Sequence, residues 1–356
     1  MRDAALHALQ NERFVHGESV VKFEEEFARY CGADFAISTA SGTSALILSL
    51  IALGARGSEV VTTPASFVAS ANSIIHADAT PKFADVTLQT YTMDPAKVRE
   101  CLNARTKAIL PVHLYGFPAS MDELLDIAAK GGISIVEDAC QGHGASYHGK
   151  KVGSIGHVGC FSFFPSKNMT VAGDGGMVVT SDELIAERVA SLRDCGRVKG
   201  AKYVHDAVGF TERLNSVQAA IGRVQLRRLD GWNEQRRQIA LKYDELLSDL
   251  DADVITPPTA NSNVFPVYHM YVIRCTRRDQ LAEWLKGSGV ETGIHYVLPI
   301  HLQPVYREMF HYEEGAFPNS EELCRKALSI PMHPYLTIDE IKFVSERIHE
   351  YYQYHR

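Results

Sequence analysis

The sequence predicts an α/β protein, in which a mainly parallel sheet wrapped by helices is followed by a smaller α+β domain. In the first half, short apolar strands alternate with helical patterns, which is typical of β-α-β units with parallel strands. The length of 356 residues suggests two domains, and the composition changes at the loop-like stretch 257–263. We expect a large domain over residues 1–235 and a small one over 236–356.

The composition is that of an ordinary globular protein and excludes several classes. The net charge is −7 and no basic stripe is present, so we expect no nucleic-acid partner. The longest apolar run, 45–55, is too short to cross a membrane, and the first residues do not resemble a signal peptide, so we expect a cytoplasmic protein. The seven cysteines lack metal-ligand spacing, which predicts free thiols and no metal.

Apolar runs bounded by turn residues predict the strands of the large domain. These are 34–38, 59–62, 81–85, 107–112, 133–138, 158–163 and 177–180. Because ligands bind at the carboxyl ends of the strands in such sheets, the residues directly after the strands are candidate site residues.

Cap residues and apolar periodicity predict the helices. Ser120 and Glu123 have the spacing of a capping box, and Ser181 and Asn215 are the expected caps of the helices that follow them. The predicted helices are 19–30, 45–53, 67–75, 95–102, 121–130, 182–193 and an unbroken 216–247.

The smaller domain is predicted to contain three strands and three helices. Thr337 and Glu340 have the spacing of a capping box for the last helix. The predicted strands are 269–274, 291–296 and 328–332, and the predicted helices are 278–288, 320–327 and 338–352.

Lys167 lies on a loop between two predicted core strands, 158–163 and 177–180. A lysine in a loop is most often a surface charge whose stem lies along the protein. If this amine is instead buried, it loses its proton more easily and can attack an aldehyde. This stretch alone leaves both interpretations open.

A turn of small residues, 39–44, connects the first strand to a helix. The free N–H groups of a helix N-terminus bind anions, Gly42 lets an anion approach the backbone, and Thr43 adds a hydroxyl. The alternative is that Ser41 or Thr43 only caps the helix. The spacing is not G-x-G-x-x-G, so a dinucleotide site is not supported.

Asp138 follows an apolar strand, with Cys140 and Gln141 directly behind it. A carboxylate at such a place must find a partner, because desolvation of an unpaired charge is costly. It could cap a helix or form a salt bridge. It could also face a protonated ring nitrogen.

Together, an anion-binding turn, a carboxylate and a lysine about thirty residues later match the fixed points of pyridoxal phosphate in a fold-type I enzyme. Several segments, in order and from about residue 16 to about residue 336, resemble the DegT/DnrJ/EryC1/StrS family of sugar aminotransferases. These segments are 41–46, 63–72, 111–116, 137–145, 161–168, 173–176, 213–220, 293–296 and 328–332. The resemblance implies a large domain with a seven-stranded-type sheet.

The resemblance also implies a role for each matching residue. Lys167 would bind the cofactor covalently and, once freed by substrate, move the proton, and Asp138 would pair with the pyridine nitrogen. Gly42, Thr43 and Ser162 would hold the phosphate. In some relatives a histidine replaces the lysine and the enzyme is a dehydratase, and Lys167 argues against that branch.

Further residues are expected around the ring and on the substrate side. The resemblance implies that Phe67 stacks on the ring and that Gln141 hydrogen-bonds near its phenolic oxygen. His295 and Tyr296, in the smaller domain, would line the substrate side. Packing in the core is the alternative for Phe67 and His295.

Three positions depart from the family pattern. Cys140 stands where alanine is common, and Cys195 where many relatives have histidine. Thr211 stands where many have an asparagine that reaches the cofactor phosphate of the neighbouring subunit. The resemblance implies a homodimer with shared active sites, and Thr211 puts that one contact in doubt.

The predicted reaction moves an amino group from glutamate, with 2-oxoglutarate as product, to C3 or C4 of a nucleotide-linked ketosugar in amino-sugar and cell-surface polysaccharide biosynthesis. The turn 173–176 favours C3, by resemblance only. One alternative is a fold-type I enzyme that acts on a non-sugar ketone. Another is a catalytically silent regulatory relative, which would require loss of Lys167 or Asp138.

Overall fold

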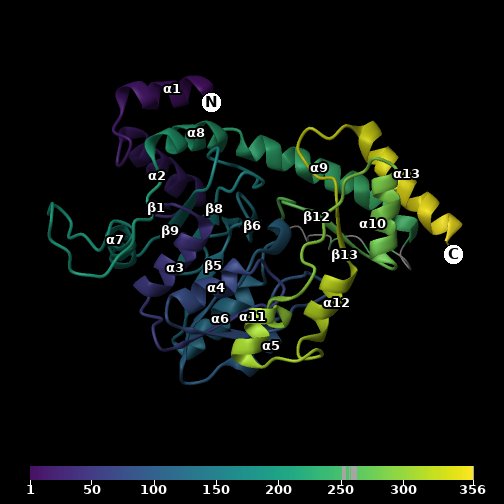
Figure 1. Cartoon of the computed structure of the whole chain (residues 1–356), viewed down its shortest axis with the longest axis horizontal. Coiled ribbons are helices and arrows are strands. Elements are labelled where there is room, and N and C mark those ends of the chain that lie inside the picture. The colour runs from purple at the N-terminus through teal and green to yellow at the C-terminus, as the bar shows by residue number, and fades with distance from the viewer. Residues whose placement is uncertain (251–253, 256, 258–262, 356) are drawn as a thin grey trace.

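The computed structural model describes residues 1–250, 254–255, 257 and 263–355. Its centre is a seven-stranded sheet with the strand order β1-β9-β8-β5-β4-β2-β3 (Figure 1). Within this sheet β9 is antiparallel to both its neighbours and the other strands are mutually parallel, as predicted. The strands are β1 Phe35–Thr39, β2 Glu59–Thr62, β3 Thr80–Phe83, β4 Thr106–Ile109, β5 Ser134–Asp138, β8 Val158–Ser162 and β9 Gly176–Thr180.

Helices surround this sheet, as expected for an α/β architecture (Figure 1). They are α1 Arg2–Asn11, α2 Glu18–Cys31, α3 Gly42–Ala52, α4 Ala69–His76, α5 Pro95–Cys101, α6 Met121–Gly131, α7 Glu183–Leu192, α8 Ser216–Leu226 and α9 Leu229–Leu247. Asn215 caps α8 as predicted. Two predicted caps are wrong, since Ser120 makes no cap bond and the carboxylate of Asp182, not Ser181, accepts from the N–H groups of α7.

The helix predicted over 216–247 is in fact two helices. α8 ends at Leu226 and α9 begins at Leu229. At the break, the N–H of Arg228 donates to the carbonyl of Gln225 at 2.9 Å, three residues earlier, which interrupts the α-helical pattern. The two helices pack on different neighbours, α8 against α1 and α2 and α9 against α13 (Ile338–Tyr354).

The C-terminal region has its own sheet, β10-β12-β13. The capping box of Thr337 and Glu340 is confirmed. The further elements are β10 Val254–Ile255, α10 Arg278–Gly287, β12 Tyr271–Cys275, α11 Pro304–Phe310, α12 Pro318–Lys326 and β13 Ala327–Ile330, with a small third sheet of β6 Ser146–Tyr147, β7 Lys150–Lys151 and β11 Val264–Phe265. Most of the loop predicted over 257–263 lies outside the described residues.

The strand predicted over 291–296 is wrong. Only Gly293 makes a bridge there, to Ser329 of β13. The alternation of apolar and polar residues resembles a strand, but the chain turns after Gly293 towards the large sheet, where the backbone carbonyl of His295 accepts a bond from Tyr115.

The chain between β12 and β13 returns to the large sheet. The carboxylate of Asp85, after β3, accepts from the N–H groups of Asn319 at 3.0 Å and Ser320 at 2.9 Å, near the start of α12. Phe83 packs in the same place against the rings of Tyr306 and Phe317. This segment therefore covers the carboxyl end of β3.

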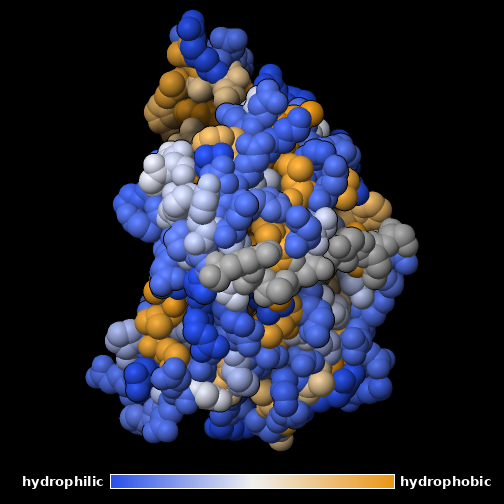
Figure 2. Space-filling model, turned by 90° about the vertical axis from the view of Figure 1, so that its right-hand side faces the viewer, coloured by the Kyte–Doolittle hydropathy of each residue, from blue (hydrophilic) through white to orange (hydrophobic). Residues whose placement is uncertain are grey.

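One face of the surface, the possible membrane and metal features, and the cysteines bear on the predictions. The face on the side of α10 and α13 is mostly hydrophilic, with separate hydrophobic spots (Figure 2). In the part of the chain that the structure describes, no helix combines the length and apolar character needed to cross a membrane, and no group of three or more His, Cys, Asp or Glu residues is placed to hold a metal. All seven cysteines are free thiols, as predicted.

Candidate active site

Lys167 lies on the loop between β8 and β9, as predicted, and its side chain is half-buried. Its backbone N–H donates to the carbonyl of Phe164 at 2.9 Å, which forms a tight turn before the lysine. Burial lowers the pKa of Lys167, whereas Cys140 and Asp138 oppose this shift. The interpretation as a partly desolvated amine is therefore favoured over that of a solvated surface charge.

Asp138 ends β5 and is buried. The hydroxyl of Ser70, on α4, donates to one carboxylate oxygen at 2.7 Å, and the N–H of Cys140 donates to the other at 3.2 Å. Neither donor carries a charge. The carboxylate can therefore still stabilise a cation bound in front of the sheet, such as a protonated ring nitrogen.

The N-terminus of α3 closes a cradle against the end of β8. A Cβ on Gly42 would lie 2.6 Å from Cβ of Ser162 and 2.8 Å from Sγ of Cys140, so only glycine permits this approach. Ser41 caps the helix by accepting from the N–H of Ser44 at 3.0 Å. The cap interpretation is thus confirmed for Ser41.

The same cradle offers donors to an anion. The first N–H groups of α3, those of Gly42 and Thr43, have no acceptor within the helix. The hydroxyl-bearing Ser162 lies directly beside them. The structure therefore brings together the three residues predicted to hold a phosphate, and their role in binding remains a prediction.

Gln141 connects the loop after β5 to the substrate-side residues. Its side chain is buried, its Oε1 accepts from the N–H of Tyr115 at 2.5 Å, and its Nε2 donates to the hydroxyl of Tyr296 at 3.1 Å. Burial raises the pKa of Tyr296, which keeps the phenol neutral. Gln141 and Tyr296 therefore lie together, as the predicted site requires.

Phe67 and His295 lie beside this pair. Phe67 is 54% exposed, so the alternative of core packing is wrong for this residue. Its ring centre lies 6.0 Å from that of Tyr296. His295 is half-buried, with its Nδ1 2.8 Å from the hydroxyl of Ser329, and burial lowers its pKa, with a smaller contribution from Lys167.

The three departures from the family pattern fall into two places. Cys140 lies in the cradle beside Gly42. Cys195 and Thr211 instead contact each other, with Sγ and Oγ1 3.4 Å apart, on the loop after α7.

Two residues near the site were missed from sequence. Glu137, next to Asp138, is fully buried and is held by four hydrogen-bond donors. Successive strand residues face opposite sides of the sheet, so Glu137 faces away from Asp138. A glutamate inside a buried strand needs buried hydrogen-bond donors, and its presence in the sequence could have indicated them. Tyr115 was also missed, and its contacts depend on a backbone conformation that no sequence pattern indicated.

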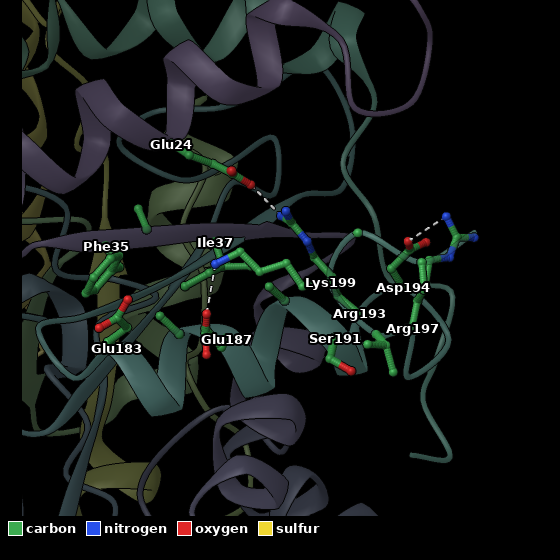
Figure 3. A pocket seen from close by; sticks show the side chains of 16 residues that line it. Glu24, Phe35, Ile37, Glu183, Glu187, Ser191, Arg193, Asp194, Arg197 and Lys199 are labelled. Atoms are coloured by element: carbon green, nitrogen blue, oxygen red, sulfur yellow. Dashed lines mark hydrogen bonds and ion pairs between the residues drawn. The ribbon is translucent and has the colours of Figure 1, made fainter. Parts of the chain in front are cut away.

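A separate cavity of about 510 Å³ lies between α2, β1, α7 and the loop that follows α7 (Figure 3). Its charged side chains form ion pairs with one another, except that Glu183 has no ion pair among the described residues. Lys199 bonds to Glu187 at 2.8 Å, and Arg193 bonds to Glu24. Most charges of this cavity are therefore already compensated within it, unlike that of Asp138.

The residues around Lys167 fit pyridoxal phosphate. A helix N-terminus closed tightly by Gly42 suits the phosphate, a buried carboxylate with neutral donors suits the ring nitrogen, and a partly desolvated amine suits the aldehyde carbon.

Comparison with known proteins places the chain among aminotransferases. It is 40% identical over 347 residues to the "Pleiotropic regulatory protein" of Geobacillus stearothermophilus, covering 97% of this chain and 92% of that one. It is 39% identical over 355 residues to the dTDP-3-amino-3,4,6-trideoxy-alpha-D-glucose transaminase of Streptomyces venezuelae, again covering 97% and 92%. The crystal structure of S. venezuelae DesV matches with a TM-score of 0.95 and 39% identity, over 98% of this chain and 93% of that one.

The profile of one protein family matches residues 1–349. The match includes the cradle, the carboxylate and the lysine of the candidate site. The chain belongs to the DegT/DnrJ/EryC1/StrS aminotransferase family.

Proposed function

We propose that the protein is a pyridoxal-phosphate-dependent aminotransferase that aminates a nucleotide-linked ketosugar. The observation that carries the proposal is the tight approach of Gly42, at the start of α3, to Ser162 at the end of β8 and to Cys140, two residues after the buried Asp138, with Lys167 on the loop that follows β8. Membership of an aminotransferase family and the named activity of the S. venezuelae transaminase support it.

The residues of the chain would divide the work as follows. Bound pyridoxal phosphate supplies an electron sink for the carbanion formed at the carbon that loses a proton. The negative charge of Asp138 favours the protonated ring nitrogen, and Gly42, Thr43 and Ser162 bind the phosphate. Lys167, whose pKa is lowered by burial, would accept the proton from the substrate carbon that bears the amino group and deliver it to the cofactor carbon that had carried the aldehyde.

Glutamate is the proposed amino donor, with 2-oxoglutarate as product. C3 is the proposed acceptor carbon, and the name of the S. venezuelae relative supports it because that name places the amino group at C3. Phe67 and Gln141 are the proposed ring contacts, and His295 and Tyr296 are the proposed contacts to the sugar.

We also propose a cytoplasmic homodimer. The loop after α7 projects from the body of the molecule (Figure 1), and Val208 and Tyr203 on it are 95% and 80% exposed. A second copy that covers these apolar side chains would remove them from water. The free cysteines are consistent with a reducing compartment.

A catalytically silent regulatory protein is the second candidate, because the relative from G. stearothermophilus is named for regulation. Lys167 and Asp138 are both present, whereas this candidate would require the loss of one of them, so catalysis is favoured.

The test is to purify the protein with pyridoxal phosphate, reduce it with borohydride and map the modified peptide. We expect yellow absorbance and a label on Lys167, and Lys167→Ala should lose both, whereas Lys150→Ala, at an exposed lysine, should keep both. Protein that stays colourless, or a label elsewhere, contradicts the proposal.

The substrate is tested separately, with glutamate and either UDP- or dTDP-linked 3-keto and 4-keto sugars or non-sugar ketones, by measuring 2-oxoglutarate. Turnover of only a non-sugar ketone would assign the other class of acceptor. A labelled protein that aminates no ketone would favour the regulatory candidate.

A further inference from the structure

Tyr115 lies at the centre of a short 3-10 turn, Leu114–Gly116, directly behind the candidate site. It is 5% exposed and has a φ of 57°, in the left-handed region that is unfavourable for a bulky side chain. A residue held in such a conformation needs surrounding contacts that stabilise it, and such residues occur often at functional sites.

The first of these contacts fixes Gln141. Because the N–H of Tyr115 donates to Oε1 of Gln141 at 2.5 Å, the amide nitrogen of Gln141 must point the other way. One hydrogen of that Nε2 is donated to the hydroxyl oxygen of Tyr296 at 3.1 Å. The amide has a second hydrogen, and the hydroxyl of Tyr296, which accepts here, keeps its own hydrogen for another partner.

The second contact fixes the residue before Tyr296. The hydroxyl of Tyr115 donates to the backbone carbonyl of His295. Tyr115 therefore holds Gln141 through its backbone and His295 through its side chain.

The turn itself is anchored to the start of the C-terminal region. The carbonyl of Gly116 accepts from the N–H of Val267 at 3.0 Å, and a Cβ on Gly116 would lie 2.9 Å from the backbone N of His269. Glycine at 116 thus allows the two segments to approach closely, and Tyr115 cannot shift without disturbing this contact.

We propose that Tyr115 is a positioning residue that couples Gln141 to the segment 295–296, so that the remaining hydrogens of Gln141 and Tyr296 are presented together to the reacting group of the substrate. The inference rests on the proposed function for its catalytic consequence. The two links are separable, because a change of the side chain removes only the bond to His295.

The test compares Tyr115→Phe with Tyr352→Phe. Tyr352 is also buried and also donates its hydroxyl to a backbone carbonyl, that of Thr276 at 2.7 Å, in the core of the C-terminal region. We expect Tyr115→Phe to raise the KM for the ketosugar about fivefold or more while kcat and cofactor absorbance change less than about twofold. Tyr352→Phe should leave the KM unchanged.

Hydrogen exchange of the peptide around residues 293–298, in protein without sugar, gives a readout that needs no turnover. Tyr115→Phe should speed this exchange, and Tyr296→Phe, which keeps the bond from Tyr115 to His295, should not. If no ketosugar reacts with the wild-type protein, the proposed function fails while this measurement still decides the coupling. Unchanged exchange in Tyr115→Phe, or an equal change in Tyr352→Phe, would overturn the inference.

Discussion

Glu137 and Asp138 are adjacent carboxylates on β5, and their surroundings differ sharply. Four donors reach Glu137, namely Nε2 of His113 at 2.9 Å and the N–H groups of Gly153, Ile155 and Gly156 at 2.7, 2.7 and 2.6 Å. Asp138 accepts from only two neutral donors in the part of the molecule described. A carboxylate whose acceptor positions are all used by the protein stabilises the fold. A carboxylate with unused acceptor positions can also accept a hydrogen bond from a ligand.

The partner of Glu137 shows that its network is purely structural. The N–H of Ala119 donates to Nδ1 of His113 at 3.1 Å, so the ring is neutral and its hydrogen is on Nε2, facing Glu137. The charge of Glu137 is therefore balanced by N–H dipoles. These dipoles belong to the turn that leads into β8, the strand before Lys167.

The largest expected effect is the loss of activity in Asp138→Asn. The substitution keeps the size of the side chain and removes the charge that favours a protonated ring nitrogen. We expect kcat to fall about 10³-fold, or about 4 kcal/mol in the activation free energy, with little change in thermal stability. Steady-state kinetics and a melting curve check both parts, and retained activity would remove Asp138 from the mechanism.

Glu137→Gln should show the opposite pattern. The amide keeps one acceptor oxygen and turns its NH₂ group towards N–H donors, so we expect the free energy of unfolding to fall by about 3 kcal/mol. The kcat of the folded protein should stay within about threefold of wild type, because the carboxylate faces away from the site. Urea unfolding measures the free energy of unfolding, and single-turnover kinetics of the folded variant measure its activity. A stable but inactive variant would contradict the structural role of Glu137.

Ser70→Ala removes one of the two donors to Asp138. We expect a loss of about 1 kcal/mol in stability and a drop in kcat of about twofold to tenfold, since the carboxylate loses a fixed orientation. Ser73→Ala is the matched control, because the hydroxyl of this buried serine on the same helix donates to a backbone carbonyl, that of Ser70. Equal kinetic effects from both variants would contradict a specific role for Ser70.

The smallest expected effect concerns the pH at which Lys167 reacts. Burial lowers its pKa, and the negative charge of Asp138 opposes this by favouring the protonated amine. In cofactor-free protein the rate of lysine acylation should rise at a lower pH for Lys167 than for an ordinary lysine. In Asp138→Asn this rise should move to still lower pH, and a move to higher pH would show that the sign is wrong.

The parts of the fold that depend on sequence patterns within a few neighbouring residues could be predicted. The strands of the large sheet and the cap of α8 follow from apolar runs and a cap residue that act within a few positions. The candidate site could also be predicted, because Lys167, Asp138 and Gly42 stand at the end of, after or between predicted strands. The carboxyl ends of parallel strands lie together at one edge of a sheet.

What could not be predicted depends on contacts between distant residues. The segment 291–296 has a strand-like pattern, but its bond to Tyr115 decides its course. Glu137 differs from Asp138 only by the face of the strand it occupies and by a turn far along the chain that supplies its donors. The break before α9 is a single tightened turn at Arg228, and no glycine or proline at 227–228 marks it in the sequence.

The return of the chain to Asp85 has a consequence for how the protein is made. Phe83 is covered by Tyr306 and Phe317, residues that leave the ribosome after every strand of the large sheet. Until they arrive, the edge of the sheet at β3 exposes this apolar ring. His295 and Tyr296 emerge only shortly before them, so the site is completed well after the large sheet, and a nascent chain that stops after α9 would be prone to aggregate.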